Sequence, residues 1–249
     1  MLKALRVQKY SQAEIFASPE VWTNSCLLQQ ITPERCDYIE RCVDKVFGRE
    51  ALRQQQVLEI GCGGGMICQE LAHRGAEMVG LDPSAGALQA ARERIQKAGL
   101  GNSVHFDQGC AESLPYADGS FSVIVCLDVL EHVSDLPKTI WEIARVLAPG
   151  GIFIFDTINR TWLARLILIW IGERFFQRWG LWPGLHDYHS FIKPRELRAL
   201  IRATHLQVRE MTGFMPSLSK GRLTLGSGWF MGVSYVGYAT KGRAAQIGQ

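Results

Sequence analysis

A glycine-rich loop directly after a short apolar run is the feature that most constrains how this chain folds. Residues 57–60 (VLEI) have the composition of a buried β-strand, and Gly61 to Gly65 (GCGGG) follow at once. Glycines allow a sharp turn and let a ligand approach the main chain. Asp82 ends the next apolar run, residues 77–81, where a carboxylate can accept hydrogen bonds from a ribose diol. These features predict a nucleoside-binding site at the carboxyl ends of parallel strands.

Strands and helices alternate at short intervals through the middle of the chain. Apolar, β-branched runs predict strands, and Ala-, Glu- and Arg-rich stretches that stop at glycine or proline predict helices. The expected strands are residues 57–60, 77–81, 104–106, 121–126 and 152–155, and the expected helices are residues 65–74, 84–98 and 137–147. This alternation is typical of a parallel, doubly wound sheet with helices on both faces.

The C-terminal part has a different pattern. A helix at residues 194–203 precedes two expected strands, 206–212 and 233–240, with a long connection between them. Such a pair favours antiparallel closure of the sheet edge. The expected fold class is therefore α/β: a doubly wound, Rossmann-like, seven-stranded and mostly parallel sheet with an antiparallel C-terminal strand pair and a helical lid.

We expect the 249 residues to form a single domain. Its expected parts are an N-terminal helical cap (1–50), a cofactor-binding core (51–156), a lid and helix insertion (157–203) and a C-terminal strand pair (204–241). The content of 47% hydrophobic and 20% charged residues excludes a disordered or collagen-like chain. The seven cysteines show no CxxC pair and no zinc-like spacing, and the first residues contain no export signal, so we expect reduced thiols and a cytoplasmic location.

The net charge of +3 is unevenly distributed: residues 51–156 have a net charge of −6, and residues 157–249 have +9. Within the basic part, segment 161–182 combines tryptophans with arginines around a short apolar run, 166–171, that is too short to span a membrane. Two interpretations remain open, a helix lying in a membrane interface and a buried lid over the site, and both can hold at once. The first makes an anionic membrane surface a partner and places the protein peripherally on the inner face of a membrane.

The glycine loop with Glu59 before it, Asp82 and the Pro149–Gly151 turn together resemble the class I S-adenosylmethionine-dependent methyltransferases, over residues 32–241. The resemblance implies that Gly61 to Gly65 passes beneath the methionine moiety and that Asp82 holds the ribose. It also implies S-adenosylmethionine as cofactor and S-adenosylhomocysteine as product. The expected cofactor-binding residues are Arg35, Glu59, Gly61, Cys62, Gly63, Gly65, Asp82, Pro83, Ala111 and Glu112 flanking adenine, and Leu127 through its backbone.

Further motifs are similar to the ubiquinone-biosynthesis O-methyltransferases, which methylate catechol-type hydroxyls on polyprenylated rings. Asn159–Arg160, His186–Asp187 and residues 191–197 (FIKPREL) carry this likeness. Residues 33–39 (PERCDYI) match the family's Pro-x-Arg-x-x-Tyr-Ile stretch, so the resemblance implies that Arg35 pairs with the cofactor's carboxylate, which an arginine suits well. Residues 10–31 lack the family's paired tryptophans, and Tyr10, Phe16 and Trp22 are the aromatic substitutes.

Asp128, Glu131 and His132 have the i, i+3, i+4 spacing that would place them on one face of a helical turn. Two carboxylates and an imidazole can hold a divalent cation such as Mg²⁺, and the resembling family is associated with a metal and a Glu-x-x-Glu-His cluster. Three roles remain open for this group: a metal site, a general base without metal, and a structural turn.

The expected chemistry is in-line methyl transfer to the hydroxyl of an aromatic, lipophilic acceptor of the catechol or quinol type. A phenol with a pKa of about 10 must lose its proton, and the candidate catalytic residues are His132, Glu131 and His186. The alternatives are an O-, N- or C-methyltransferase of soluble secondary metabolism and a catalytically silent scaffold of the same fold. Met66 stands where a dinucleotide fingerprint has its third glycine, which disfavours a nicotinamide oxidoreductase. The scattered basic residues match no nucleic-acid-reading motif, so we expect no nucleic-acid partner.

Overall fold

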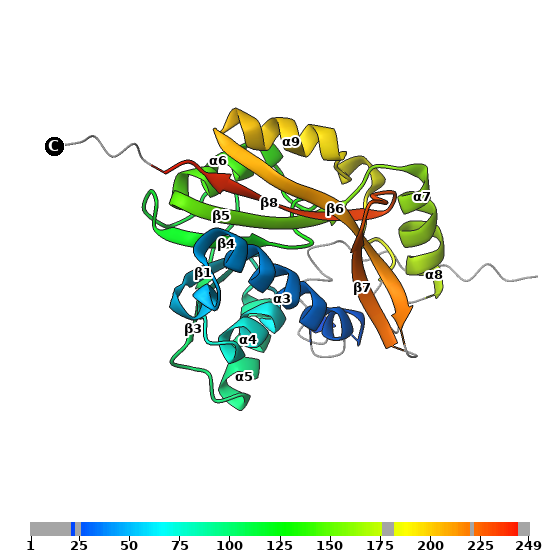
Figure 1. The fold of residues 1–249 in the computed structure, drawn as a ribbon. Coiled ribbons are helices and arrows are strands. Elements are labelled where there is room, and N and C mark those ends of the chain that lie inside the picture. Colours follow the sequence, from blue (N-terminus) through cyan, green and yellow to red (C-terminus); the bar gives the residue numbers. More distant parts are fainter. Residues whose placement is uncertain (1–20, 23–25, 176–181, 220–221, 244–249) are drawn as a thin grey trace, which may run out of the picture.

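A single twisted β-sheet organises the described part of the computed structural model, which covers residues 21–22, 26–175, 182–219 and 222–243. Its strand order is β3-β2-β1-β4-β5-β8-β6-β7 (Figure 1). The strands are β1 (Gln56–Ile60), β2 (Glu77–Asp82), β3 (Val104–Gln108), β4 (Phe121–Cys126), β5 (Leu147–Ile158), β6 (Leu206–Ser219), β7 (Arg222–Gly228) and β8 (Ser234–Lys241).

The pairing confirms the predicted fold class. Strands β1 to β5 pair in parallel, and β8 lies antiparallel between β5 and β6. The sheet has one strand more than predicted, because β7 pairs with the second half of β6 as a hairpin at the sheet edge. That hairpin fills most of the connection that the sequence left without structure. The chain order reverses at β1, which has β2 on one side and β4 on the other, so a crevice at their carboxyl ends is the usual ligand site of such a sheet.

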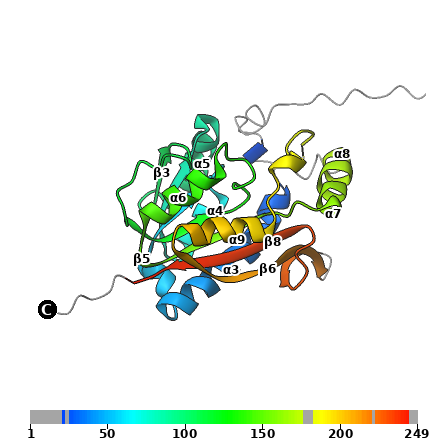
Figure 2. The ribbon, with the colours of Figure 1, turned by 90° about the horizontal axis from the view of Figure 1, so that it is seen from above.

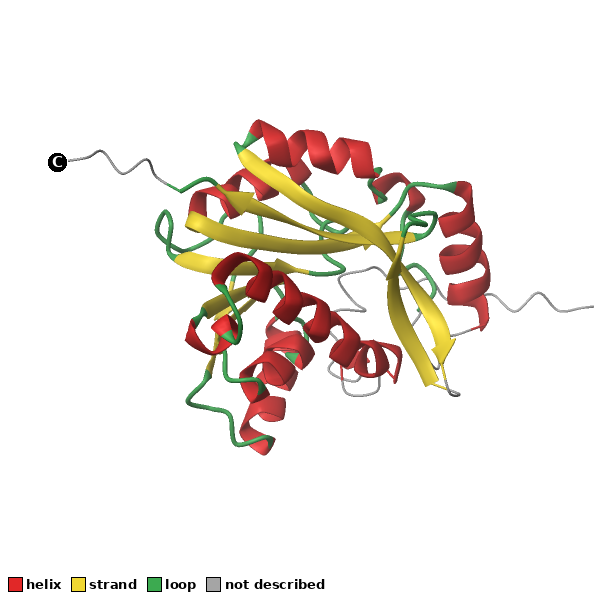
Figure 3. Cartoon of the chain, viewed as in Figure 1, coloured by secondary structure: helices red, strands yellow, loops and turns green. Residues whose placement is uncertain are grey.

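Helices cover both faces of the sheet (Figures 1 and 2). Helices α3, α4 and α5 lie on one face, and α6 and α9 lie on the other. The helix bounds are α3 (Cys26–Phe47), α4 (Met66–His73), α5 (Ala85–Lys97), α6 (Leu136–Val146), α7 (Trp162–Ala164), α8 (Glu173–Phe175) and α9 (Pro194–Ala203), with short helices η1 (Ala51–Gln54), η2 (Arg165–Gly172) and η4 (Tyr188–Ser190). Helix and strand layers alternate as Figure 3 shows.

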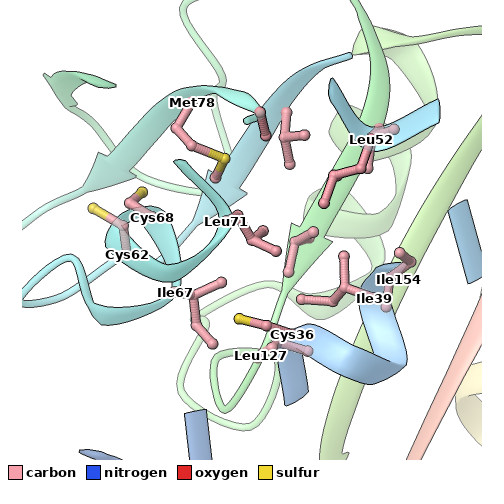
Figure 4. Packing of buried hydrophobic residues seen from close by; sticks show 14 of the residues in the cluster. Cys36, Ile39, Leu52, Cys62, Ile67, Cys68, Leu71, Met78, Leu127 and Ile154 are labelled. Atoms are coloured by element: carbon pink, nitrogen blue, oxygen red, sulfur yellow. The ribbon is translucent and has the colours of Figure 1, made fainter. Parts of the chain in front are cut away.

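The sheet has two apolar faces because successive side chains of a central strand point to opposite sides. Val57 and Ile154 pack beneath α3 and α4, whereas their neighbours Leu58 and Phe155 pack beneath α6 and α9. Figure 4 shows Ile39 of α3, Leu71 of α4 and Ile154 of β5 in the first of these clusters. Because nearly every residue of these strands is apolar, both layers of helices can be held by the same short runs.

The lid segment is one nearly continuous helix made of α7, η2 and α8. Its inner side contributes Ala164 to a small buried cluster with Ile158 and Phe191, while Trp162, Trp170 and Phe175 are exposed. This helix therefore has a buried side against Ile158 and Phe191 and exposed aromatic side chains elsewhere, and both interpretations of the segment stay predictions. Residues 176–181 of the predicted segment lie outside the described residues. No helix of the described part is long and apolar enough to cross a membrane.

Candidate active site

The loop after β1 turns sharply because three of its glycines adopt the left-handed backbone conformation. Gly61, Gly63 and Gly65 have φ of 71°, 51° and 73°. A Cβ at Gly61 would lie 2.2 Å from the Val129 side chain, so Gly61 also permits a close approach to the loop after β4. The backbone amides of Gly61 and Cys62 donate to the Leu81 carbonyl at 2.7 and 3.1 Å, which ties the loop to the end of β2.

Asp82 fixes the glycine loop from the neighbouring strand. One oxygen of its buried carboxylate accepts the Gly63 amide at 2.9 Å, and the other accepts the Ser84 amide at 2.8 Å. Burial raises the pKa of Asp82 above its ordinary value, while these two hydrogen bonds oppose the rise. Each oxygen retains an acceptor site, so the carboxylate can hold a ribose diol while it holds the loop.

Glu59 is a fully buried acid directly beneath this loop. Its Oε2 accepts the Cys68 thiol of α4 at 2.8 Å. Burial raises the pKa of Glu59 to about 8, and the hydrogen bond with Cys68 opposes that rise. Glu59 therefore joins β1 to α4 inside the protein, and its role in cofactor binding stays a prediction.

Trp22 covers the glycine loop from the N-terminal cap. A Cβ at Gly63 or Gly64 would lie 2.3 or 2.5 Å from the Trp22 side chain. Arg94 of α5 donates to the carbonyls of both Gly64 and Trp22, at 2.8 and 2.9 Å, and so joins the cap to the loop. The other proposed aromatic substitutes, Tyr10 and Phe16, lie outside the described residues.

The remaining residues expected to bind the cofactor, with Ala111 and Glu112 expected beside adenine, come from loops after β2, β3 and β4. Ala111 and Leu127 are buried, and Pro83 is exposed with its carbonyl accepting Gln108 at 3.0 Å. Glu112 accepts both the amide and the hydroxyl of Ser134 at 2.7 Å, which joins two of these loops. The arrangement is compatible with the predicted roles, which stay predictions.

Arg35 lies in a buried cluster with two carboxylates. Its Nη2 is 2.6 Å from Asp128 Oδ2 and 3.1 Å from Asp156 Oδ2. Asp156, at the end of β5, also accepts the Asp128 amide at 2.6 Å. Burial lowers the pKa of Arg35, but the two neighbouring carboxylates raise it further, so the guanidinium stays charged. Arg35 thus already has two anionic partners within the chain, and its contact with the cofactor's carboxylate stays a prediction.

The expected helical face of Asp128, Glu131 and His132 is not present. These residues lie in an irregular turn that precedes α6, and Asp128 has a left-handed φ of 53° that a right-handed helix excludes. The Asp156 carboxylate accepts the backbone amide of Asp128, and the Asp128 carboxylate faces Arg35. Glu131 instead accepts the Thr157 hydroxyl at 2.8 Å. The interpretation as a helical turn is therefore wrong.

The predicted metal site does not fit this geometry. Within the described ranges, no group of three or more His, Cys, Asp or Glu side chains is arranged to hold a metal ion. Asp128 pairs with Arg35, and one oxygen of Glu131 accepts the Thr157 hydroxyl, so the structure does not arrange these carboxylates and His132 as ligands of Mg²⁺. We derive no step through a metal.

The structure instead brings the three catalytic candidates to one end of the sheet. Burial and the charge of Asp128 raise the pKa of Glu131. Burial, with His186 nearby, lowers the pKa of His132 to about 4, so its imidazole is neutral at neutral pH. The rings of His132 and His186 lie 6.1 Å apart. A neutral imidazole there can accept a proton from a bound hydroxyl.

Sequence reasoning missed three residues of this site. Asp156 and Thr157 end the fifth parallel strand, and a polar pair at the carboxyl end of a buried strand was a usable signal. Glu173 bonds to the loop that carries His186, and its only signal was an acid interrupting an apolar helix.

Comparisons with known proteins agree with this geometry. A family model described as "Methyltransferase domain" matches residues 58–155. A ubiquinone biosynthesis O-methyltransferase of Hahella chejuensis is 36% identical over 217 residues, which are 86% of this chain and 85% of the relative. Its counterpart in Agrobacterium fabrum is 34% identical over 223 residues, which are 88% and 87%.

Solved structures share the fold at lower identity. A methyltransferase of Thermotoga maritima, described as a possible histamine N-methyltransferase, has a TM-score of 0.63 and 21% identity, covering 92% of this chain and 99% of its own. The [4+2]-cyclase SpnF has a TM-score of 0.66 and 17% identity, covering 96% and 98%. The cyclase illustrates that this fold can carry other chemistry.

Replacing Asp82 should remove much of the affinity for S-adenosylhomocysteine. Asp82→Ala deletes the acceptor of the Gly63 and Ser84 amides and the expected ribose contact, and a charged hydrogen bond is worth about 1.5–3 kcal/mol. Calorimetric titration should show an affinity loss of roughly tenfold to a hundredfold. Glu77→Ala, an exposed change at the other end of β2, is the matched control. Unchanged affinity in folded Asp82→Ala would remove Asp82 from the site.

Glu59 should make the apoprotein less stable as the pH rises. Its pKa is about 8 in the fold and lower when unfolded, so the native state binds the extra proton between these values. The stability contributed by this group is therefore lost as the pH rises from about 4.5 toward 8. In urea melts, Glu59→Gln should gain on wild type by on the order of 1–3 kcal/mol between pH 5 and 8. The stability of Glu59→Leu should depend on pH as that of Glu59→Gln does, although its absolute stability should differ. If the stability of wild type and of both variants changed equally with pH, the pKa of Glu59 would not be raised.

Proposed function

This chain belongs to the family of the ubiquinone biosynthesis O-methyltransferases, which are S-adenosylmethionine-dependent enzymes, and from that membership we propose its reaction and acceptor class. We propose that it transfers the methyl group of S-adenosylmethionine to a hydroxyl of a lipophilic catechol- or quinol-type ring. The observation that carries the proposal is the Asp82 carboxylate bound to the Gly63 amide at the carboxyl ends of β1 and β2. That contact prepares a nucleoside site beside the buried acids and histidines that follow β4 and β5.

The transfer breaks the bond between the methyl carbon and the sulfonium sulfur as the acceptor oxygen bonds to that carbon. The sulfur keeps the electron pair, and S-adenosylhomocysteine leaves. The hydroxyl proton must go to a protein base, because a phenol of pKa about 10 is mostly protonated at neutral pH. The candidates are His132, Glu131 and His186. Alignment of oxygen, methyl and sulfur within the closed site supplies much of the rate.

The surface of the lid supports a lipophilic acceptor. Trp162, Trp170 and Phe175 are exposed along the lid helix, and Trp229 and Phe230 are exposed in the connection after β7. Both elements lie at the same end of the molecule in Figures 1 and 2. Aromatic side chains of this kind suit a membrane interface, and the net charge of +9 over residues 157–249 favours anionic headgroups. We propose an anionic membrane surface as the partner from which the acceptor is taken.

A prenyl chain on the acceptor should raise turnover. Each buried CH₂ of the chain contributes about 0.8 kcal/mol, so a prenylated catechol should have a kcat/KM at least roughly tenfold above that of the bare ring. Formation of S-adenosylhomocysteine measures transfer, with Asp82→Ala as the control of weakened cofactor binding. Equal turnover of both rings would favour the soluble-metabolite alternative. Cofactor binding without transfer to either ring would favour the silent scaffold.

The exposed aromatic residues should anchor the protein to anionic vesicles. At low salt we expect co-sedimentation with phosphatidylglycerol vesicles and much less with pure phosphatidylcholine. The double variant Trp162→Ser/Phe175→Ser should lower the partition coefficient roughly tenfold or more, because two large apolar side chains are lost. Trp141→Ser, at an exposed tryptophan of α6, is the matched control and should bind like wild type. A wild type that stays in solution with anionic vesicles at low salt would refute the membrane partner.

A further inference from the structure

Glu173 is a buried carboxylate that joins the lid helix to the loop carrying His186. It is the first residue of α8 and follows the apolar helix η2. Its Oε2 accepts the Gly184 amide at 2.7 Å, and its Oε1 accepts the His186 amide at 2.9 Å. The same Oε1 lies 3.2 Å from Nδ1 of the His186 ring. The two side chains are only 8% and 9% exposed.

This contact determines which nitrogen of His186 carries the proton. A carboxylate accepts hydrogen bonds and cannot donate them, so Nδ1 must be the protonated nitrogen in this pair. The other ring nitrogen, Nε2, then holds a free lone pair and can accept a proton. A buried carboxylate is costly unless it is well hydrogen-bonded, and here three donors from one short loop satisfy it.

The ring of His186 lies between the lid and the turn after β4. Its centroid is 6.1 Å from that of His132, with the planes 33° apart, and 6.1 Å from that of Phe191, edge to face. Phe191 packs the ring from the side, and Glu173 fixes it from the lid. The imidazole is thereby held at the end of the sheet where the acceptor hydroxyl has to lie.

We propose that Glu173 is the positioning residue that makes His186 the base of the methyl transfer, an inference that rests on the function proposed above. The acceptor O–H bond breaks, and its proton goes to Nε2 of His186. The oxygen's electron pair forms the new bond to the methyl carbon, and the electrons of the carbon–sulfur bond go to sulfur. Glu173 keeps the ring in the Nδ1–H tautomer and stabilises the imidazolium that results.

A double-mutant cycle separates this role from that of a loop clamp. Glu173→Gln keeps the size of the side chain but removes the negative charge that stabilises the imidazolium, so kcat should fall about 100-fold or more. His186→Asn should lose a similar factor, and the double variant should be no slower than His186→Asn alone. The KM for S-adenosylmethionine and the affinity for S-adenosylhomocysteine should stay within about twofold of wild type. Glu196→Gln, which removes a carboxylate paired with Arg160, is a control expected to retain kcat.

Nitrogen-15 NMR of the histidine rings tests the tautomer directly and needs no turnover. We expect His186 as the Nδ1–H tautomer in wild type. Additive losses in the double variant, or an Nε2–H ring in wild type, would reduce Glu173 to a loop clamp and overturn the proposal. A wild type that binds S-adenosylhomocysteine and shows the Nδ1–H ring but methylates no acceptor would refute the proposed function, and with it the role of His186 as base.

Discussion

The ion pairs of the buried Arg35 guanidinium join helix α3 to the loop after β4 and to strand β5. Arg35 comes from α3 and contacts Asp128 after β4 and Asp156 at the end of β5. A buried charge of this kind is tolerated only with close partners, so the position of α3 on the sheet is fixed by these acids. The Arg35 Nε is buried and has no hydrogen-bond partner within the described part of the chain. One donor therefore remains for a further carboxylate, such as that of the cofactor.

The parts of the fold that the sequence predicted are those encoded by local patterns. Apolar runs alternate between two helix layers along the central strands, and the conformations of Gly61 and Gly63 require glycine. The role of Asp82 was predicted from its position at the end of a strand, because the parallel topology puts that strand end beside the glycine loop. Local residue patterns and the regular parallel topology were therefore enough to predict these parts.

The parts that it did not predict depend on contacts between distant residues. Asp128 and Arg35 are 93 positions apart, and no spacing rule connects them. The i, i+3, i+4 pattern at Asp128 suggested a helix, but Asp156 binds the Asp128 amide and the backbone turns left-handed there. Contacts of the same long-range kind turn Asp128 toward Arg35 and one oxygen of Glu131 toward Thr157. Local spacing of titratable residues therefore predicted which groups gather at the site, but not how they are oriented.

The lid explains why the fold alone does not determine the acceptor. The sheet and glycine loop are shared with proteins as different as a [4+2]-cyclase, so substrate selection must come from elements outside the core. In this chain the lid helix carries the exposed Trp170 and, three residues later, the buried Glu173. An exposed aromatic side chain and the carboxylate that bonds the loop of His186 therefore lie within one turn of the same helix.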